Sequence, residues 1–173
     1  MTPDTVEVLV LGGGPAGLVA AIRAGDLGAR TALVTRDAFG GMAALALARS
    51  GEHLAAAVTI HGSLATGRPA GPGTVRARLL ACHGALDPHV PLDHVTAFAE
   101  EMSAAGADWQ LIMYGGALHG FTHSDATPGA VPGVGYDPAA DAGSFSAARG
   151  FLAEVFAAGQ EDPANSEPLA DPP

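Results

Sequence analysis

Short apolar runs alternate along the chain with longer segments in which apolar residues recur every three or four positions. The runs predict buried strands and the longer segments predict helices, because side chains repeat with a period of two in a strand and 3.6 in a helix. The predicted strands are 6–11, 31–35, 55–60, 75–82 and 109–114. The predicted helices are 15–27, 41–49, 92–105 and one capped by Asp137–Pro138, whose expected buried face is Phe145, Ala148, Leu152, Val155 and Phe156.

Strands that alternate with helices predict an α/β fold with three α/β/α layers and a mostly parallel sheet of about five strands, joined by right-handed crossovers. At 173 residues the chain fits one domain, which we place at 1–157. Its start, 1–38, has the strand–helix–strand order of a Rossmann-like unit, and 39–157 forms the remainder. Residues 158–173 are rich in proline and acidic residues and predict a disordered tail.

Composition narrows the possible partners. The net charge of −10 argues against nucleic acid and anionic membranes, which require a positive surface. No apolar run is long enough to span a bilayer and no signal peptide is evident, so a cytoplasmic protein is expected.

The chain contains no lysine, which excludes a Schiff-base or phosphate-loop lysine. Its one cysteine, Cys82, excludes an internal disulfide and is interpreted as a small buried residue.

A glycine loop follows the first predicted strand and opens the first helix. Gly12, Gly14 and Gly17 fit the G-x-G-x-x-G pattern, in which the loop approaches a pyrophosphate at a helix N-terminus. Residues 8–17 (VLVLGGGPAG), with 20–23 (AAIR) and Gly28-Ala29, resemble the N-terminus of the FAD-dependent pyridine nucleotide-disulfide oxidoreductases over about residues 5–41.

This resemblance implies FAD as a possible cofactor held at the three glycines. In that family an acidic residue ends the second strand, whereas Thr35 and Arg36 stand here and Asp37 is the first acid. The family's redox cysteine pair and its later domains have no counterpart in the chain. The alternative reading is that the glycines form a tight strand–helix turn that binds no ligand.

The remainder of the chain, 39–157, resembles the C-terminal half of the dienelactone hydrolase family, which implies a partial α/β-hydrolase fold. The residues that carry the resemblance are 39–41 (FGG), 46–51 (ALARSG), 61–62 (HG), 83–91 (HGALDPHVP), 114–121 (YGGALHGF), 136–140 (YDPAA) and 151–156 (FLAEVF). Residues 39–43 (FGGMA) suit both families, so we predict that the two pieces are joined there.

The resemblance assigns Asp87 as the acid and His119 as the base of the family's catalytic triad. Its nucleophile is a cysteine in Gly-x-Cys-x-Gly-Gly, and Ala38 stands at that position here, with Arg36 in place of the first glycine. The early half of the fold, which supplies one oxyanion-hole N–H, has no counterpart in the chain. The resemblance therefore implies a hydrolase of small-molecule esters or enol-lactones that is impaired by the missing nucleophile.

Two alternatives remain open: a fragment of a flavin- or dinucleotide-binding oxidoreductase, and a non-catalytic remnant. His119 and His123 are four residues apart, as metal ligands on a helix can be, but Gly120 argues for a loop and no metal is expected. His61 and His83, each before a glycine at a strand end, are interpreted as structural. Sheet edges left by the missing strands make self-association possible.

Overall fold

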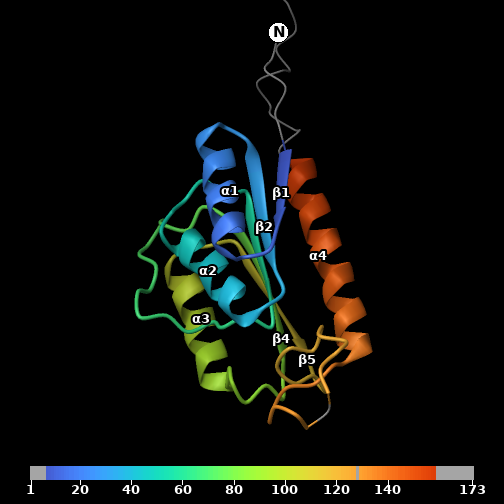
Figure 1. Cartoon of the computed structure of the whole chain (residues 1–173). Helices are drawn as coiled ribbons and strands as arrows, with labels where there is room; N and C mark the ends of the chain where they lie inside the picture. The colour runs from blue at the N-terminus through green and yellow to red at the C-terminus, as the bar shows by residue number, and fades with distance from the viewer. Residues whose placement is uncertain (1–6, 128, 159–173) are drawn as a thin grey trace, which may run out of the picture.

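The computed structural model describes residues 7–127 and 129–158, so the predicted tail lies outside the described residues except for Ala158, which ends the last helix. Within the described residues, five strands form one parallel sheet (Figure 1). The strands are β1 (Glu7–Leu11), β2 (Arg30–Thr35), β3 (Ala56–Ile60), β4 (Arg78–Gly84) and β5 (Trp109–Tyr114). They pair in the order β1-β2-β3-β4-β5, so each strand lies beside the one that precedes it in the sequence.

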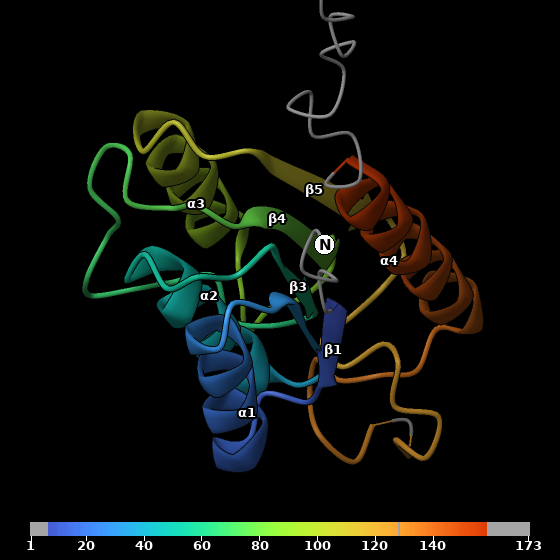
Figure 2. The ribbon, with the colours of Figure 1, turned by 90° about the horizontal axis from the view of Figure 1, so that it is seen from above.

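Helices cover both faces of the sheet, as the alternation of strands and helices predicted. Figure 2 shows α1 (Pro15–Asp26), α2 (Ala38–Arg49) and α3 (Leu92–Ala104) on one face of the sheet and α4 (Pro138–Ala158) on the other. The predicted α/β/α arrangement is therefore confirmed. Each of the three helices connects two neighbouring parallel strands, which places all three on the same side of the sheet.

Alternate residues of the central strands pack into two separate apolar cores, one on each face of the sheet. Leu33 of β2 and Leu79 of β4 face α1, α2 and α3, while Val34 and Leu80, the next residue in each case, face α4. Since both faces are covered, the strands read as nearly continuous apolar runs in the sequence. This explains why short apolar runs located all five strands to within a few residues.

Two predicted details differ from the structure. Helix α2 begins at Ala38 rather than at residue 41, because the carboxylate of Asp37 accepts a hydrogen bond from the N–H of Gly40 and caps the helix. The predicted buried face of α4 is wrong at Phe145, which is 56% exposed. The buried positions of this helix are instead Ala140, Ser144, Ala148, Phe151 and Val155.

The connection from β3 to β4, residues 61–77, has no helix and is fixed by a buried ion pair. The guanidinium of Arg49 on α2 donates to both carboxylate oxygens of Glu101 on α3, at 2.9 and 2.8 Å. Arg49 also donates to the carbonyl of Leu64, and Glu101 accepts the N–H of Ala70. The pair thus links two helices to both halves of the loop.

Strand β1 occupies one edge of the sheet and pairs, among the described residues, with β2 alone. Leu9 and Leu11 are 49% and 74% exposed on this strand. Self-association through the sheet edges remains a prediction. No helix within 7–127 and 129–158 combines the length and the apolar composition needed to cross a membrane.

Candidate active site

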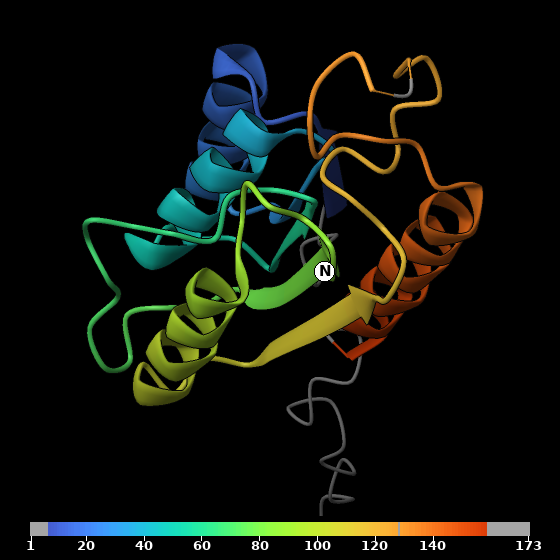
Figure 3. The same cartoon turned by 90° about the horizontal axis from the view of Figure 1, so that it is seen from below.

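The five strands end at the same edge of the sheet, because they are parallel, and the connections that follow them lie at that edge (Figure 3). Asp87 follows β4 and His119 follows β5. The turn that contains Ala38 follows β2, and His61 follows β3. Residues that are far apart in the sequence therefore share one end of the molecule.

Asp87 and His119, the two predicted triad residues, are in direct contact. The Nδ1 atom of His119 lies 2.7 Å from Oδ2 of Asp87. The other carboxylate oxygen of Asp87 accepts the backbone N–H groups of His89 and Val90, at 2.8 and 3.1 Å. The side chain of Asp87 is fully buried, while that of His119 is 16% exposed. The aspartate is thus fixed by three hydrogen bonds. The other ring nitrogen of His119, Nε2, does not contact Asp87 and can exchange a proton with a ligand.

The carboxylate of Asp87 is held in its ionised form. Burial alone would raise its pKa, but the hydrogen bond and charge of His119 and the two backbone N–H groups outweigh burial and lower the pKa below its ordinary value. An ionised aspartate accepts the Nδ1–H of His119 and so fixes the tautomer in which Nε2 carries a lone pair. This is the arrangement that a general base requires.

The loop that carries His119 is anchored to the segment 133–135. The N–H of His119 donates to the carbonyl of Gly133, and the N–H of Gly135 donates to the carbonyl of His119. Gly120 then has a φ of 64°, in the left-handed region that glycine adopts without strain, and turns the chain toward residues 121–123. As predicted, His119 and His123 lie on a loop.

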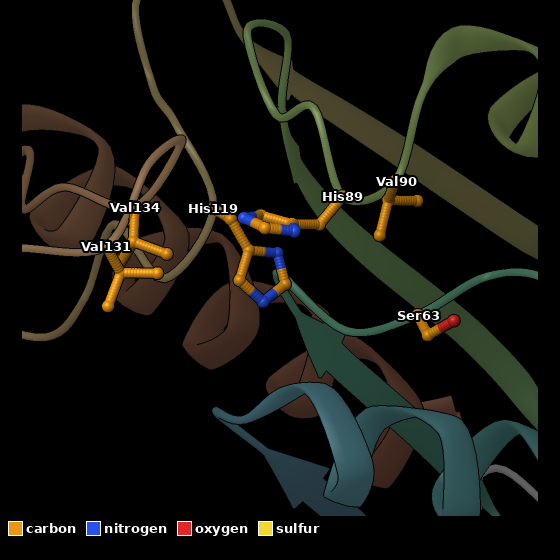
Figure 4. Close-up of a pocket in the computed structure, with 6 residues that line it drawn as sticks. All are labelled: Ser63, His89, Val90, His119, Val131 and Val134. Atoms are coloured by element: carbon orange, nitrogen blue, oxygen red, sulfur yellow. The ribbon is translucent and has the colours of Figure 1, made fainter.

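A cavity of about 320 Å³ opens beside His119 (Figure 4). Its lining residues are Ser63, His89, Val90, His119, Val131 and Val134. In Figure 4 the two valines of the 131–134 segment lie on one side of the His119 ring, and Val90 and Ser63 lie on the other, with the Ser63 hydroxyl directed away from the ring. The cavity therefore offers apolar walls to a small ligand and places two imidazoles, those of His89 and His119, among them.

The turn from β2 into α2 is an ordinary capped helix start. Arg36 and Asp37 separate the strand from Ala38, the first helical residue, and Asp37 has an extended backbone with φ −146°. In α/β-hydrolases the nucleophile lies on a sharp, strained turn. Among the described residues of this chain the non-glycine residue with a left-handed φ is His61, and the residue at position 38 is an alanine that begins a helix.

Cys82 offers no substitute nucleophile. It lies within β4, is 2% exposed, and burial raises the pKa of its thiol to about 11. A thiol with that pKa is almost entirely protonated at neutral pH, and the thiolate is the reactive form. Its predicted role as a small buried residue is confirmed by its burial.

Five histidines surround the strand ends, but their arrangement does not suit a metal. Among the described residues no three histidine, cysteine or acidic side chains are placed to hold a metal ion. Burial, followed by the nearby charges of His123 and His119, lowers the pKa of His61 to about 4. Burial also lowers the pKa of His83. Both histidines are therefore neutral at physiological pH.

The glycine loop packs against the first turn of α2. Gly12 has a φ of 108° and its N–H donates to the carbonyl of Val34, while a Cβ on Gly17 would lie 2.1 Å from the carbonyl oxygen of Gly12. A Cβ on Gly13 would lie 2.3 Å from the Cα of Gly40. Gly13 is therefore essential to the packing, although it is the one glycine of the triplet that the dinucleotide pattern leaves unspecified.

These residues do not fit an FAD. Dinucleotides bind where the strand order of an open sheet reverses, and among the described strands the order runs from β1 to β5 without a reversal. Asp37, the acid available to hold ribose hydroxyls, directs its carboxylate to the N–H of Gly40 instead. The geometry favours the alternative reading that Gly12, Gly14 and Gly17 belong to a tight strand–helix turn.

The glycine loop yields a testable contrast. We expect Gly13→Ala to lower the free energy of unfolding by about 1–3 kcal/mol or more, because its methyl group meets backbone atoms that cannot move independently. A Cβ at Gly14 meets nothing within 4 Å, so Gly14→Ala should cost below about 1 kcal/mol, the loss of a glycine N-cap. Urea denaturation of both variants measures the difference. Equal stability of the two variants would contradict the observed packing.

Two family models match the chain. Residues 38–156 match the model described as "Dienelactone hydrolase family", and residues 7–65 match "FAD binding domain". Among curated proteins, an uncharacterized protein of Caenorhabditis elegans, K02A2.1, is 44% identical over 75 residues, which make up 43% of this chain and 48% of that protein. Dihydrolipoyl dehydrogenase 2 of Haloarcula marismortui is 66% identical over 35 residues, 20% of this chain and 7% of that protein.

Solved structures that resemble this chain agree with the dienelactone hydrolase match. The structure described as "m3DLH" is 40% identical with a TM-score of 0.66, and the match covers 73% of this chain and 52% of the m3DLH chain. A dienelactone hydrolase-like promiscuous phosphotriesterase, P91, from metagenomic libraries is 33% identical with a TM-score of 0.69, covering 80% of this chain and 60% of its own. The chain thus spans about half the length of several proteins it matches.

Proposed function

Because the chain belongs to the dienelactone hydrolase family, we propose that its Asp87–His119 site binds small esters or lactones and hydrolyses them slowly, without a covalent intermediate. The observation that carries this proposal is the 2.7 Å contact between the two side chains at the mouth of an apolar cavity. The family's thiol is replaced by the methyl group of Ala38, which cannot attack a carbonyl.

In this mechanism water takes the place of the missing thiol. His119 accepts a proton at Nε2 from a water molecule as the water oxygen bonds to the carbonyl carbon of the ester. Asp87 stabilises the imidazolium that forms. The tetrahedral intermediate then collapses, the bond to the leaving alcohol breaks, and His119 returns the proton to the alcohol oxygen.

The remaining residues support a small, uncharged ligand. Val90, Val131 and Val134 provide apolar contacts, and the net charge of −10 disfavours anionic substrates. An aryl ester or a lactone ring suits such a cavity better than a phosphorylated or polymeric substrate.

Substitution of His119 tests this function. With an aryl acetate as the substrate, we expect His119→Gln to lower the protein-dependent rate by about a hundredfold or more, the usual contribution of a general base. His53→Gln is the matched control, since His53 is exposed and its ring contacts Arg76 rather than the site. Release of the aryl alcohol, followed by absorbance, measures the rate. If His119→Gln retains the rate of the natural chain, the site is elsewhere.

The two family matches also support a join between pieces of different origin near Phe39-Gly40-Gly41. The pairing of β1 with β2 puts the first piece into the same sheet as the second. The Gly13→Ala variant tests this arrangement too. A single melting transition of the whole chain that moves to lower temperature supports one folded unit, whereas proteolytic loss of residues 1–36 from an otherwise stable remainder argues against it.

A further inference from the structure

His61 has three unusual structural properties. The sequence gives no sign of them beyond a histidine that precedes a glycine. His61 is 1% exposed, its φ is 44°, and its Nδ1 atom has no hydrogen-bond partner among the described residues. A left-handed backbone is costly for a residue with a Cβ, and buried polar atoms without partners are rare. Such strain persists where the surrounding structure requires it, and it concentrates at functional sites.

The ring of His61 packs against the loop that carries the proposed base. Its Nε2 atom is 2.8 Å from Oγ1 of Thr122, a residue that is itself 3% exposed. The ring also packs edge-on against those of His119, Phe121 and His123, with centroids 5.8, 5.2 and 5.1 Å away. His61 thus contacts alternate side chains of the loop on both sides of Thr122.

The backbone of Thr122 is also held by the β2–α2 turn. The guanidinium of Arg36 donates to the carbonyl of Thr122 at 3.1 Å, and Nε2 of His123 lies 3.3 Å from the carbonyl oxygen of Arg36. Thr122 is therefore fixed through its side chain by His61 and through its carbonyl by Arg36. This anchor lies three positions after His119 in the chain.

We propose that His61 is a positioning residue, which through Thr122 fixes the 119–123 loop so that the His119 ring stays hydrogen bonded to Asp87. The proposal rests on the function proposed above, since it concerns the same base. It assigns a role to a residue that the sequence marked as structural.

The chemistry of His61 suits this role. Because burial holds its pKa at about 4, the ring remains neutral while the adjacent His119 gains a proton during the reaction. A protonated neighbour at 5.8 Å would oppose that charge. An aromatic ring with one polar edge can also fill the space below the loop and bind Thr122, which an aliphatic side chain cannot do.

The test uses the proton shared by Nδ1 of His119 and Oδ2 of Asp87, which gives a far-downfield proton resonance in NMR spectra. Asp87→Asn identifies the resonance by removing it. Thr122→Val deletes the hydroxyl at nearly constant volume, and Thr122→Ser restores a hydroxyl. His61→Asn keeps a residue that tolerates the left-handed backbone but shortens the side chain.

We expect Thr122→Val and His61→Asn to accelerate solvent exchange of this proton by about tenfold, the equivalent of one lost hydrogen bond, and Thr122→Ser to restore slow exchange. This readout requires no turnover, so it reports on the positioning even if the natural chain proves inactive. If Thr122→Val melts at a lower temperature but its exchange rate and chemical shift match those of the natural chain, His61 is merely structural and the proposal is wrong. If His61→Asn does not fold, the Thr122 pair decides the question alone.

Discussion

The Ala38→Cys variant is expected to hydrolyse aryl esters at least about a hundredfold faster than the natural chain. The reason is that the Asp87–His119 pair is already assembled, at 2.7 Å, and lacks a group to activate. A thiol at position 38 would pass its proton to His119 and attack the carbonyl, forming an acyl-enzyme that water then hydrolyses. Release of the aryl alcohol, with a burst equal to the enzyme concentration, measures both steps.

The double variant Ala38→Cys/His119→Gln is the control for a thiol that reacts without the base. Its rate should fall back to that of free thiols in solution. A mass increase of one acyl group on the single variant, and on no other cysteine, would locate the intermediate at position 38. If Ala38→Cys remains as slow as the natural chain, the base does not reach the turn between β2 and α2.

The expected gain is far below the roughly millionfold contribution of a nucleophile in an intact triad. The β2–α2 turn is a helix start capped by Asp37, and we expect a new thiol there to be less well aimed than one on a strained turn. The family match begins at residue 38, after the early strand whose loop gives α/β-hydrolases one oxyanion-hole N–H, and one missing donor typically costs about a hundred- to thousandfold. Both effects limit the rate even when the thiol is present.

The Arg49→Ala variant is expected to lose about 3–5 kcal/mol of unfolding free energy, because it leaves the Glu101 carboxylate buried and unpaired. The side chains of Arg49 and Glu101 are 5% and 9% exposed. Burial raises the pKa of Glu101, but Arg49 and the N–H of Ala70 outweigh burial and lower it. The pair therefore contributes stability above the ordinary carboxyl range, and this contribution is lost as the pH falls through the lowered pKa.

The double variant Arg49→Met/Glu101→Leu separates the charge from the packing. Since it removes both charges and retains apolar volume, its stability should lie near that of the natural chain. Urea denaturation at neutral pH compares the three proteins. An Arg49→Ala variant as stable as the natural chain would mean that Glu101 reaches water after all, and that the 61–77 loop needs no ion pair.

Most of the fold follows from the sequence because both faces of the sheet are covered. Continuous apolar runs such as that of β3 identified the strands, and glycines after helices identified where the helices end. Helix α4 was harder to predict, because its alanines, serines and glycines give a weak apolar period, and Phe145 was placed on the wrong face. The start of α2 was missed because the cap is an aspartate whose role depends on the N–H of Gly40.

Some residues of the site could be predicted from the sequence and others could not. Asp87 and His119 follow strand ends and match a family pattern, so the sequence predicted that they act as a pair. The structure joins them by a hydrogen bond. Gly13 and Thr122 left no comparable signal. Their importance comes from contacts with Gly40 and His61, each distant in the chain, and no periodicity or spacing within one sequence records such contacts.

The sequential strand order has a consequence for synthesis. Each strand pairs with its predecessor, so the sheet can grow strand by strand as the chain leaves the ribosome, with little delay from loop closure. The second face behaves differently, since among the described residues it is covered by α4, which follows all the strands. Val34, Val58 and Leu80 therefore stay exposed until the final helix emerges. The nascent chain should be most prone to chaperone capture at that stage.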